Sequence, residues 1–128
     1  MIFEKRKHRR FLTQDKAYAV LGNHFTKVGK LQDISIGGLA FRYIENTEDC
    51  VQGSSTVGIF VSEDEFYLPD LACRLVYDAP LYVIDNTQYS KISFRINRCG
   101  VQFKAINEYQ LQKLEFFINH YTRKVKPS

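Results

Sequence analysis

The stretch Asp33-Ile34-Ser35-Ile36-Gly37-Gly38 stands between two segments, 27–34 and 38–43, in which apolar and polar side chains alternate. This alternation, with Val28 and Leu31 among the inward candidates, predicts two half-buried β-strands joined by a polar turn. Asp and Ser can hydrogen-bond nearby backbone amides, and two glycines accept positive φ and let a ligand approach the main chain. The stretch therefore predicts either a hairpin turn capped by its own Asp33 or a turn shaped for an anion or a base edge.

Other short segments of the chain have the same strand-like character. They are residues 17–21, 57–62, 66–78, 81–84, 91–97 and 99–103. No helical pattern separates these segments, so an antiparallel barrel or sandwich is the predicted architecture. The segments 81–84 and 91–97 flank a polar stretch, residues 85–90, that is typical of a hairpin tip, and we expect residues 79–97 to form an extended hairpin that contacts either a partner or a second copy of the chain.

The hydrophobic period changes near the C-terminal end of the sequence. Asn107 and Gln110 have the spacing of the N-cap and N3 residues of a capping box. Apolar residues then follow at helical spacing, at Leu111, Leu114, Phe117, Ile118 and Tyr121. We expect one amphipathic helix whose apolar stripe covers an end or a side of the barrel, with pairing to another protein as the less favoured use.

The positive charge is concentrated at the N-terminal end. The 128-residue chain has 18 Lys and Arg against 14 Asp and Glu, and five of the basic residues lie in the first ten positions. Residues 11–128 are balanced, with 13 basic and 13 acidic residues. Length and charge predict one domain, in which a basic arm (1–12) carrying an RxxxR motif precedes a β-rich body (13–128). Such local charge suits a small polyanion better than a long nucleic acid.

The sequence argues against an enzyme and against a metal site. Ser35, Asp33 and either His8 or His24 could form a hydrolytic triad in principle, but no nucleophile-elbow pattern surrounds Ser35. Paired carboxylates in an apolar setting are also missing. The three cysteines, at positions 50, 73 and 99, form no CxxC pair. We expect no catalytic residue, metal or cofactor.

Hydropathy and cysteine content indicate the cellular compartment in which the chain is expected to lie. No apolar run approaches the roughly 20 residues of a membrane helix, so no membrane insertion is expected. An odd number of widely spaced cysteines fits a reducing cytoplasm, in which the thiols are buried as small hydrophobic groups.

Two motifs together indicate a family. Arg6-Lys7-His8-Arg9-Arg10 has the form RxxxR, and residues 33–38 have the form DxSxxG. Their order and their spacing, with the later segments CRLVYD and CGVQF, resemble the PilZ domain family of bacterial receptors for cyclic di-GMP. The resemblance covers nearly the whole chain and implies a six-stranded antiparallel β-barrel with a C-terminal α-helix.

The resemblance also implies a binding site for cyclic di-GMP. Arginine forms bidentate contacts with phosphate oxygens and with guanine O6 and N7, and a carboxylate accepts from guanine N1 and N2. The implied ligand-binding residues are Arg6, Arg10, Asp33, Ser35, Gly37 and Gly38, with Lys5, Arg9 and Tyr77 as secondary contacts. Of these, Tyr77 either stacks on a base or is a core tyrosine.

The function implied is that of a cyclic di-GMP receptor that folds its arm over the ligand and signals to a protein partner. Motility, surface polysaccharide and similar outputs are all compatible with the family, and the partner and the choice between monomer and homodimer stay open. The alternative is a small β-barrel that binds RNA or single-stranded DNA through its basic arm. A structural or adaptor protein without ligand is the third reading.

Overall fold

The computed structural model describes residues 8–22, 27–45, 54–85 and 93–123. The elements are β1 (Phe11–Thr13), β2 (Ala17–Leu21), β3 (Lys27–Ser35), β4 (Gly38–Glu45), β5 (Ser54–Val61), β6 (Tyr67–Asp85), β7 (Ser93–Phe103), α1 (Glu108–Tyr121) and β8 (Thr122–Arg123). Most of the predicted strands and the single predicted helix are therefore present, with shifted ends.

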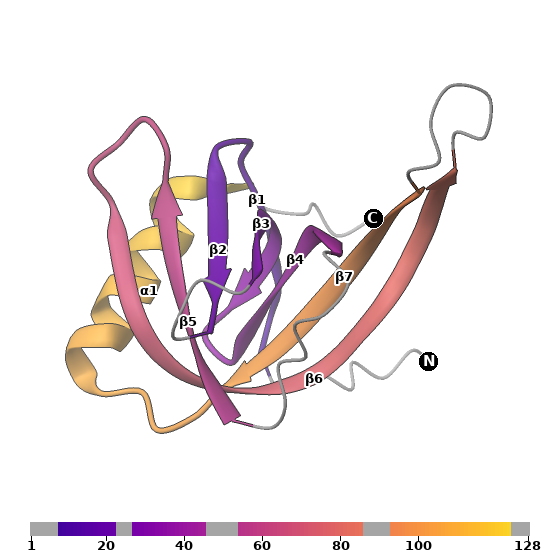
Figure 1. Cartoon of the computed structure of the whole chain (residues 1–128). Helices are drawn as coiled ribbons and strands as arrows, with labels where there is room; N and C mark the ends of the chain where they lie inside the picture. Colours follow the sequence, from indigo (N-terminus) through magenta and orange to yellow (C-terminus); the bar gives the residue numbers. More distant parts are fainter. Residues whose placement is uncertain (1–7, 23–26, 46–53, 86–92, 124–128) are drawn as a thin grey trace, which may run out of the picture.

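A closed barrel forms the body of the described chain (Figure 1). Its six strands follow one another in the order β2, β5, β6, β7, β4, β3, and pairing of β2 with β3 closes the ring. All of these pairings are antiparallel. The predicted six-stranded antiparallel barrel is confirmed, and closure removes the free edges that an open sheet would expose.

The inward side chains of the six strands fill the barrel. Large apolar residues such as Leu31, Phe41 and Ile59 are at most 1% exposed, and each contributes about 1.5–3 kcal/mol through burial. The thiols of Cys73 and Cys99 are fully buried in this core, as predicted. The third cysteine, Cys50, lies outside the described residues.

Helix α1 packs on the barrel through one face. Its predicted capping box is present, because Gln110 N–H donates to Asn107 Oδ1 at 2.8 Å and Asn107 N–H donates to Gln110 Oε1 at 3.1 Å. Leu114 and Phe117 are fully buried, and the Phe117 ring lies 5.4 Å from that of Phe66, which precedes β6. The predicted role of the apolar stripe as a cover for the barrel is confirmed.

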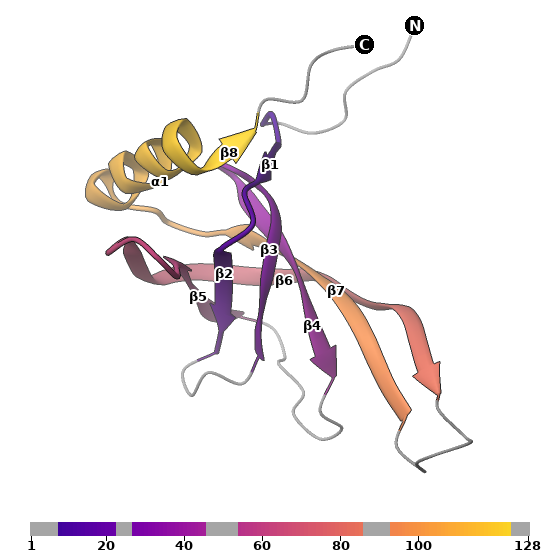
Figure 2. The ribbon, with the colours of Figure 1, turned by 90° about the horizontal axis from the view of Figure 1, so that it is seen from above.

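Strands β6 and β7 extend beyond the barrel as a long hairpin (Figures 1 and 2). The sequence predicted a break in each strand, yet both are continuous because Ala79 pairs with Arg98 across the expected break. Two β-bulges, between Leu75 and Tyr77 and between Pro80 and Tyr82, absorb the irregularity. The expected extended hairpin is therefore present.

Two short strands flank the barrel that the sequence did not predict. In β1, Phe11 pairs with Ile34 of β3, and Leu12 pairs with Arg123 of β8. Segments of two or three residues are too short to show a period. These pairs anchor the end of the basic arm beside the DxSxxG turn.

One predicted alternation is wrong at the start of β3. Lys27 points inward and is 7% exposed, whereas Val28 points outward and is 50% exposed. Lys27 of β3 pairs with Leu21 of β2, and because paired residues share a face of the sheet, Lys27 points inward like the buried Leu21. Inside the barrel, the ammonium group of Lys27 contacts Tyr43 and Asp78.

Candidate functional site

A β-bulge in β3 turns the DxSxxG side chains toward the outside of the barrel. Leu31 pairs with Phe41 and points inward, and the register then shifts so that Asp33 pairs with Ala40. Without the shift, strict alternation from Leu31 would direct Asp33 into the core. Asp33 and Ser35 thus share one outer face, where they are 8% and 5% exposed.

The turn that follows is fixed by its own hydrogen bonds. The Gly37 amide donates to Ser35 Oγ at 3.0 Å, and the Phe103 amide of β7 donates to the Gly37 carbonyl at 2.9 Å. Neither Gly37 nor Gly38 adopts the positive φ that glycine permits. Close approach explains the glycines instead: a Cβ at Gly38 would lie 2.2 Å from the Val101 carbonyl oxygen.

A second bulge brings an aromatic ring to the same outer face. The register shift after Leu75 makes Tyr77 pair with Gly100, so the tyrosine points outward and Asp78 inward. A Cβ on Gly100 would lie 2.2 Å from the Tyr77 ring, so the absence of a side chain at Gly100 leaves room for the ring at this position. Tyr77 is consequently a surface residue beside the turn and not a core tyrosine.

Two arginines face the Asp33 carboxylate from opposite sides of the site. Arg10 Nη1, at the end of the arm, lies 3.8 Å from Asp33 Oδ1. Arg98 of β7 donates from Nη2 to Asp33 Oδ2 at 2.6 Å and from Nε to the Tyr77 hydroxyl at 3.0 Å. Sequence reasoning missed Arg98, because this residue falls in the break that was expected between the segments 91–97 and 99–103.

These elements border a hollow of about 490 Å³, here called the outer pocket. Its lining residues are His8, Arg10, Ser35, Ile36, Gly37, Gly38, Leu39, Val76, Tyr77, Gly100, Val101, Gln102, Phe103, Ala105 and Ile106. The volume falls in the range of roughly 300–1,000 Å³ typical of small-molecule sites. The pocket is therefore large enough for a small organic ligand.

The predicted site residues divide into three groups. Arg10, Ser35, Gly37, Gly38 and Tyr77 line the outer pocket. Asp33 lies next to it but is covered by its arginine partners, and Arg9 stacks over the Phe11 ring at 5.3 Å, away from the lining. Lys5 and Arg6 lie outside the described residues.

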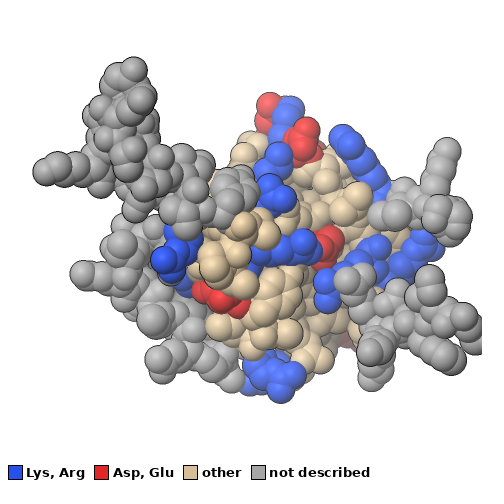
Figure 3. Space-filling view, turned by 90° about the vertical axis from the view of Figure 1, so that its right-hand side faces the viewer, with Lys and Arg blue, Asp and Glu red and all other residues tan. Residues whose placement is uncertain are grey.

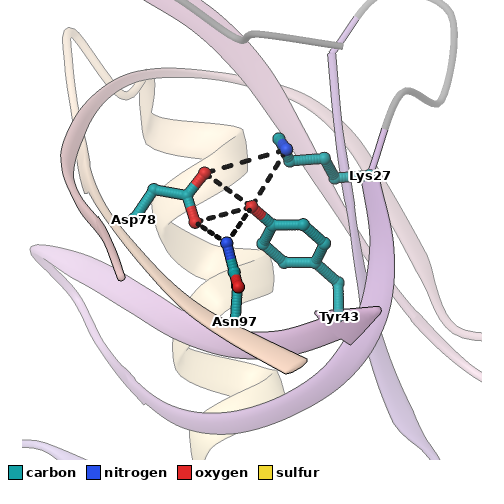
Figure 4. Close-up of polar contacts among 4 residues, drawn as sticks. All are labelled: Lys27, Tyr43, Asp78 and Asn97. Atoms are coloured by element: carbon teal, nitrogen blue, oxygen red, sulfur yellow. Dashed lines mark hydrogen bonds and ion pairs between the residues drawn. The ribbon is translucent and has the colours of Figure 1, made fainter. Parts of the chain in front are cut away.

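A separate polar cluster lies inside the barrel (Figure 4). Tyr43 donates to Asp78 Oδ1 at 2.6 Å and accepts from Lys27 Nζ at 3.0 Å, and Asn97 Nδ2 donates to both Tyr43 and Asp78. Burial, and then the hydrogen bond to Asp78, raise the pKa of Tyr43 well above its ordinary value. We interpret this cluster as structural, because it joins β3, β4, β6 and β7, with Lys27, Tyr43 and Asn97 buried and Asp78 partly exposed.

Two further findings concern the described ranges only. They contain no group of three or more His, Cys, Asp and Glu side chains placed to hold a metal ion. Within the same ranges, α1 is too short and too polar to cross a bilayer.

Comparison with known proteins places the fold. The PilZ domain of YcgR from Escherichia coli, solved with c-di-GMP, superposes with a TM-score of 0.65 at 13% identity, covering 92% of each chain. MrkH, described as a c-di-GMP-dependent transcription regulatory factor, superposes with a TM-score of 0.62 at 16% identity, and a K. pneumoniae MrkH complex with c-di-GMP gives 0.60 at 16%. The match covers about half of each MrkH chain. No family model and no curated protein matches the sequence. The chain therefore has a PilZ-like fold.

Proposed function

We propose that this chain is a receptor for cyclic di-GMP, which it binds in the outer pocket. One observation carries the proposal: two β-bulges turn Asp33, Ser35 and Tyr77 onto one outer face, beside Arg10. A dinucleotide with two phosphates and two guanines needs cations, a carboxylate and a stacking surface. The solved PilZ domain of the same fold, that of YcgR, contains c-di-GMP, which supports the assignment.

Each residue has a distinct role in the proposed complex. Arg10 binds phosphate oxygens or the O6 and N7 atoms of guanine, and Arg6, with Lys5 and Arg9 as secondary contacts, contributes further positive charge. Asp33 accepts hydrogen bonds from guanine N1 and N2, and so selects guanine over adenine. These roles define a guanine-specific anion site in which no bond is made or broken.

Ser35 and the glycines shape the floor of the site, and Tyr77 offers a ring for stacking. The Ser35 hydroxyl already accepts from the Gly37 amide, so its proton is available for donation to a base or a phosphate. Gly38 allows close approach of the β7 backbone and Gly37 leaves room for the His8 ring, so both glycines shape the turn that the proposed site needs.

Binding changes the conformation of the arm in this proposal. His8 lies against Gly37 in the pocket lining, and Phe11 is held by its pairing with Ile34. The change is therefore confined to residues before Phe11. We expect the amides of residues 8–10 to gain protection from hydrogen exchange when cyclic di-GMP binds, and unchanged exchange there would count against the movement.

The remade arm would present a surface to a protein partner, as a monomer or a homodimer. The hairpin of β6 and β7 offers a second contact surface, since it projects beyond the barrel (Figure 2). Motility, polysaccharide synthesis and similar processes are the outputs we consider.

Nucleic acid is the alternative ligand. On the face drawn in Figure 3, the Lys and Arg side chains that are not hidden by grey residues form separate groups with other surface between them. A polymer with a charge every few ångströms is better matched by a continuous basic stripe. This grouping favours the small ligand.

Isothermal titration with cyclic di-GMP tests the proposal, with cyclic di-AMP and a short RNA as competitors. We expect saturable binding that rejects the adenine analogue, and a loss on the order of tenfold or more in Arg10→Ala and Asp33→Ala. Arg42→Ala is the matched control, because Arg42 is an exposed outer residue of β4 outside the pocket lining. Absence of binding, or affinity that instead grows with RNA length, would refute the proposal.

A further inference from the structure

The carboxylate of Asp33 already has a partner on each oxygen. Oδ2 accepts from Arg98 Nη2 at 2.6 Å, and Oδ1 faces Arg10 Nη1 at 3.8 Å. The Asp33 side chain is 11% exposed and that of Arg98 is 34% exposed, so the guanidinium is the more accessible of the pair. A ligand that approaches Asp33 from solvent therefore contacts Arg98 before it contacts the carboxylate.

Arg98 is held in this position by a second contact. Its Nε donates to the Tyr77 hydroxyl at 3.0 Å, and the Tyr77 ring is fixed against Gly100. Since Nη2 and Nε are used at once, the guanidinium plane is oriented by two acceptors from two different strands. The charge-assisted hydrogen bond between Arg98 and Asp33 is therefore stronger than an isolated ion pair on the surface.

Guanine and a guanidinium present similar edges to a carboxylate. The base offers N1–H and an N2 amino hydrogen side by side, and arginine offers a planar fork of N–H donors. Arg98 Nη2 already lies on Oδ2 of an Asp33 side chain that is only 11% exposed, which leaves little room for a base edge at the same carboxylate. Guanine recognition by Asp33 therefore requires that the bond from Arg98 be broken or shared.

We propose that Arg98 is a specificity-determining competitor that occupies the guanine-reading carboxylate until the ligand displaces it. This inference rests on the proposed function, and in particular on the reading of guanine by Asp33. Arg98 raises the threshold for occupancy, because the ligand has to replace the charge-assisted hydrogen bond that Asp33 accepts from the guanidinium. Displacement also removes a hydrogen bond from Tyr77, which frees that ring to adjust to the base.

The sign of the effect in Arg98→Ala separates this role from a simple cationic contact. Loss of a nearby positive charge alone would weaken binding of a doubly anionic ligand, as we expect to a small degree in Arg42→Ala, the cross-strand neighbour of Arg98. Loss of the competitor would instead strengthen it. We expect Arg98→Ala to bind cyclic di-GMP roughly five- to tenfold more tightly than the unmodified chain.

A second variant tests the support given by the tyrosine. Tyr77→Phe keeps the ring and removes the hydroxyl that accepts from Arg98, so we expect a smaller gain of roughly twofold. It also guards against misreading Arg98→Ala if that variant folds poorly, which circular dichroism would detect.

Isothermal titration of the unmodified chain, Arg98→Ala, Tyr77→Phe and Arg42→Ala with cyclic di-GMP decides the matter. Tighter binding in Arg98→Ala and Tyr77→Phe, with equal or weaker binding in Arg42→Ala, supports the competitor. If the unmodified chain binds but Arg98→Ala binds equally or more weakly, the competitor is refuted and the receptor stands. If none of the folded proteins binds, the proposed function itself fails.

Discussion

Replacing Asp78 by Asn should destabilise the barrel far more than replacing its cationic partner. Lys27 is 7% exposed, and its Nζ lies 3.7 Å from Asp78 Oδ2 and 4.2 Å from the centre of the Tyr43 ring. Asp78→Asn keeps the volume but leaves the lysine charge buried without a counter-ion. Breaking a buried pair in this way costs about 3–5 kcal/mol. Because the Asp78 side chain is 23% exposed, we expect about 2–3 kcal/mol after allowance for solvent.

Replacing the lysine instead of the aspartate leaves a carboxylate that still has hydrogen-bond partners. In Lys27→Met, Asp78 keeps the hydrogen bonds from Tyr43 and Asn97 and its access to water. The expected cost is about 1 kcal/mol. The double variant should be more stable than Asp78→Asn alone, because it no longer buries an unpaired ammonium.

Urea unfolding at pH 7, followed by far-ultraviolet circular dichroism because the chain lacks Trp, measures these differences. Lys30→Met is the matched control, since Lys30 lies on the same strand in an exposed pair with Asp15 and should cost less than about 0.5 kcal/mol. The reasoning is refuted if Asp78→Asn unfolds within about 0.5 kcal/mol of the unmodified chain, or if Lys27→Met is the more damaging variant.

Three other perturbations have expected outcomes. Gly38→Ala should cost about 1–3 kcal/mol and weaken cyclic di-GMP binding, because the new Cβ would meet a backbone oxygen of β7; urea unfolding and titration calorimetry measure the two effects, and unchanged values would contradict the close approach. Phe117→Ala should cost about 3–5 kcal/mol by opening a cavity under α1, and a loss below about 1 kcal/mol in the same unfolding assay would show that the helix contributes little to the core. Burial raises the pKa of Cys73 to about 11 and that of Cys99 to about 12. Because both values exceed the ordinary value of 9.0, this stability is complete below about pH 9 and is lost as the pH rises, by about 1 kcal/mol per thiol from pH 8 to pH 10. Urea curves at the two pH values should show the loss, and a Cys99→Ala chain with an equally large loss would contradict the assignment.

Much of the fold could be predicted from local patterns. The alternation in residues 17–21 and 38–43 and the capping box at Asn107 each depend on neighbouring residues only, and the structure has strands and a helix there. The joining of the predicted segments 66–78 and 81–84 into the single strand β6 could not be predicted, because the continuity comes from pairing with β7 and not from the sequence of β6 itself.

The site was predictable in its motif and unpredictable in its geometry. Asp33 and Ser35 follow from the motif, but a bulge between Leu31 and Asp33 decides that they face outward, and a bulge is a property of two strands together. Arg98 is 65 residues from Asp33 in the chain, so only the barrel brings the two side chains into contact. The buried Lys27 was missed because its counter-ion comes from a distant strand.

The most direct test of the central claim is a titration of the ¹⁵N-labelled chain with cyclic di-GMP, followed by amide shifts. We predict that the largest shifts fall on residues 8–10 of the arm, on residues 33–38 of the turn, on Tyr77 and on residues 98–102 of β7, with α1 little changed. Shifts that saturate elsewhere, or no shifts at all, would contradict the assignment of the outer pocket as the cyclic di-GMP site.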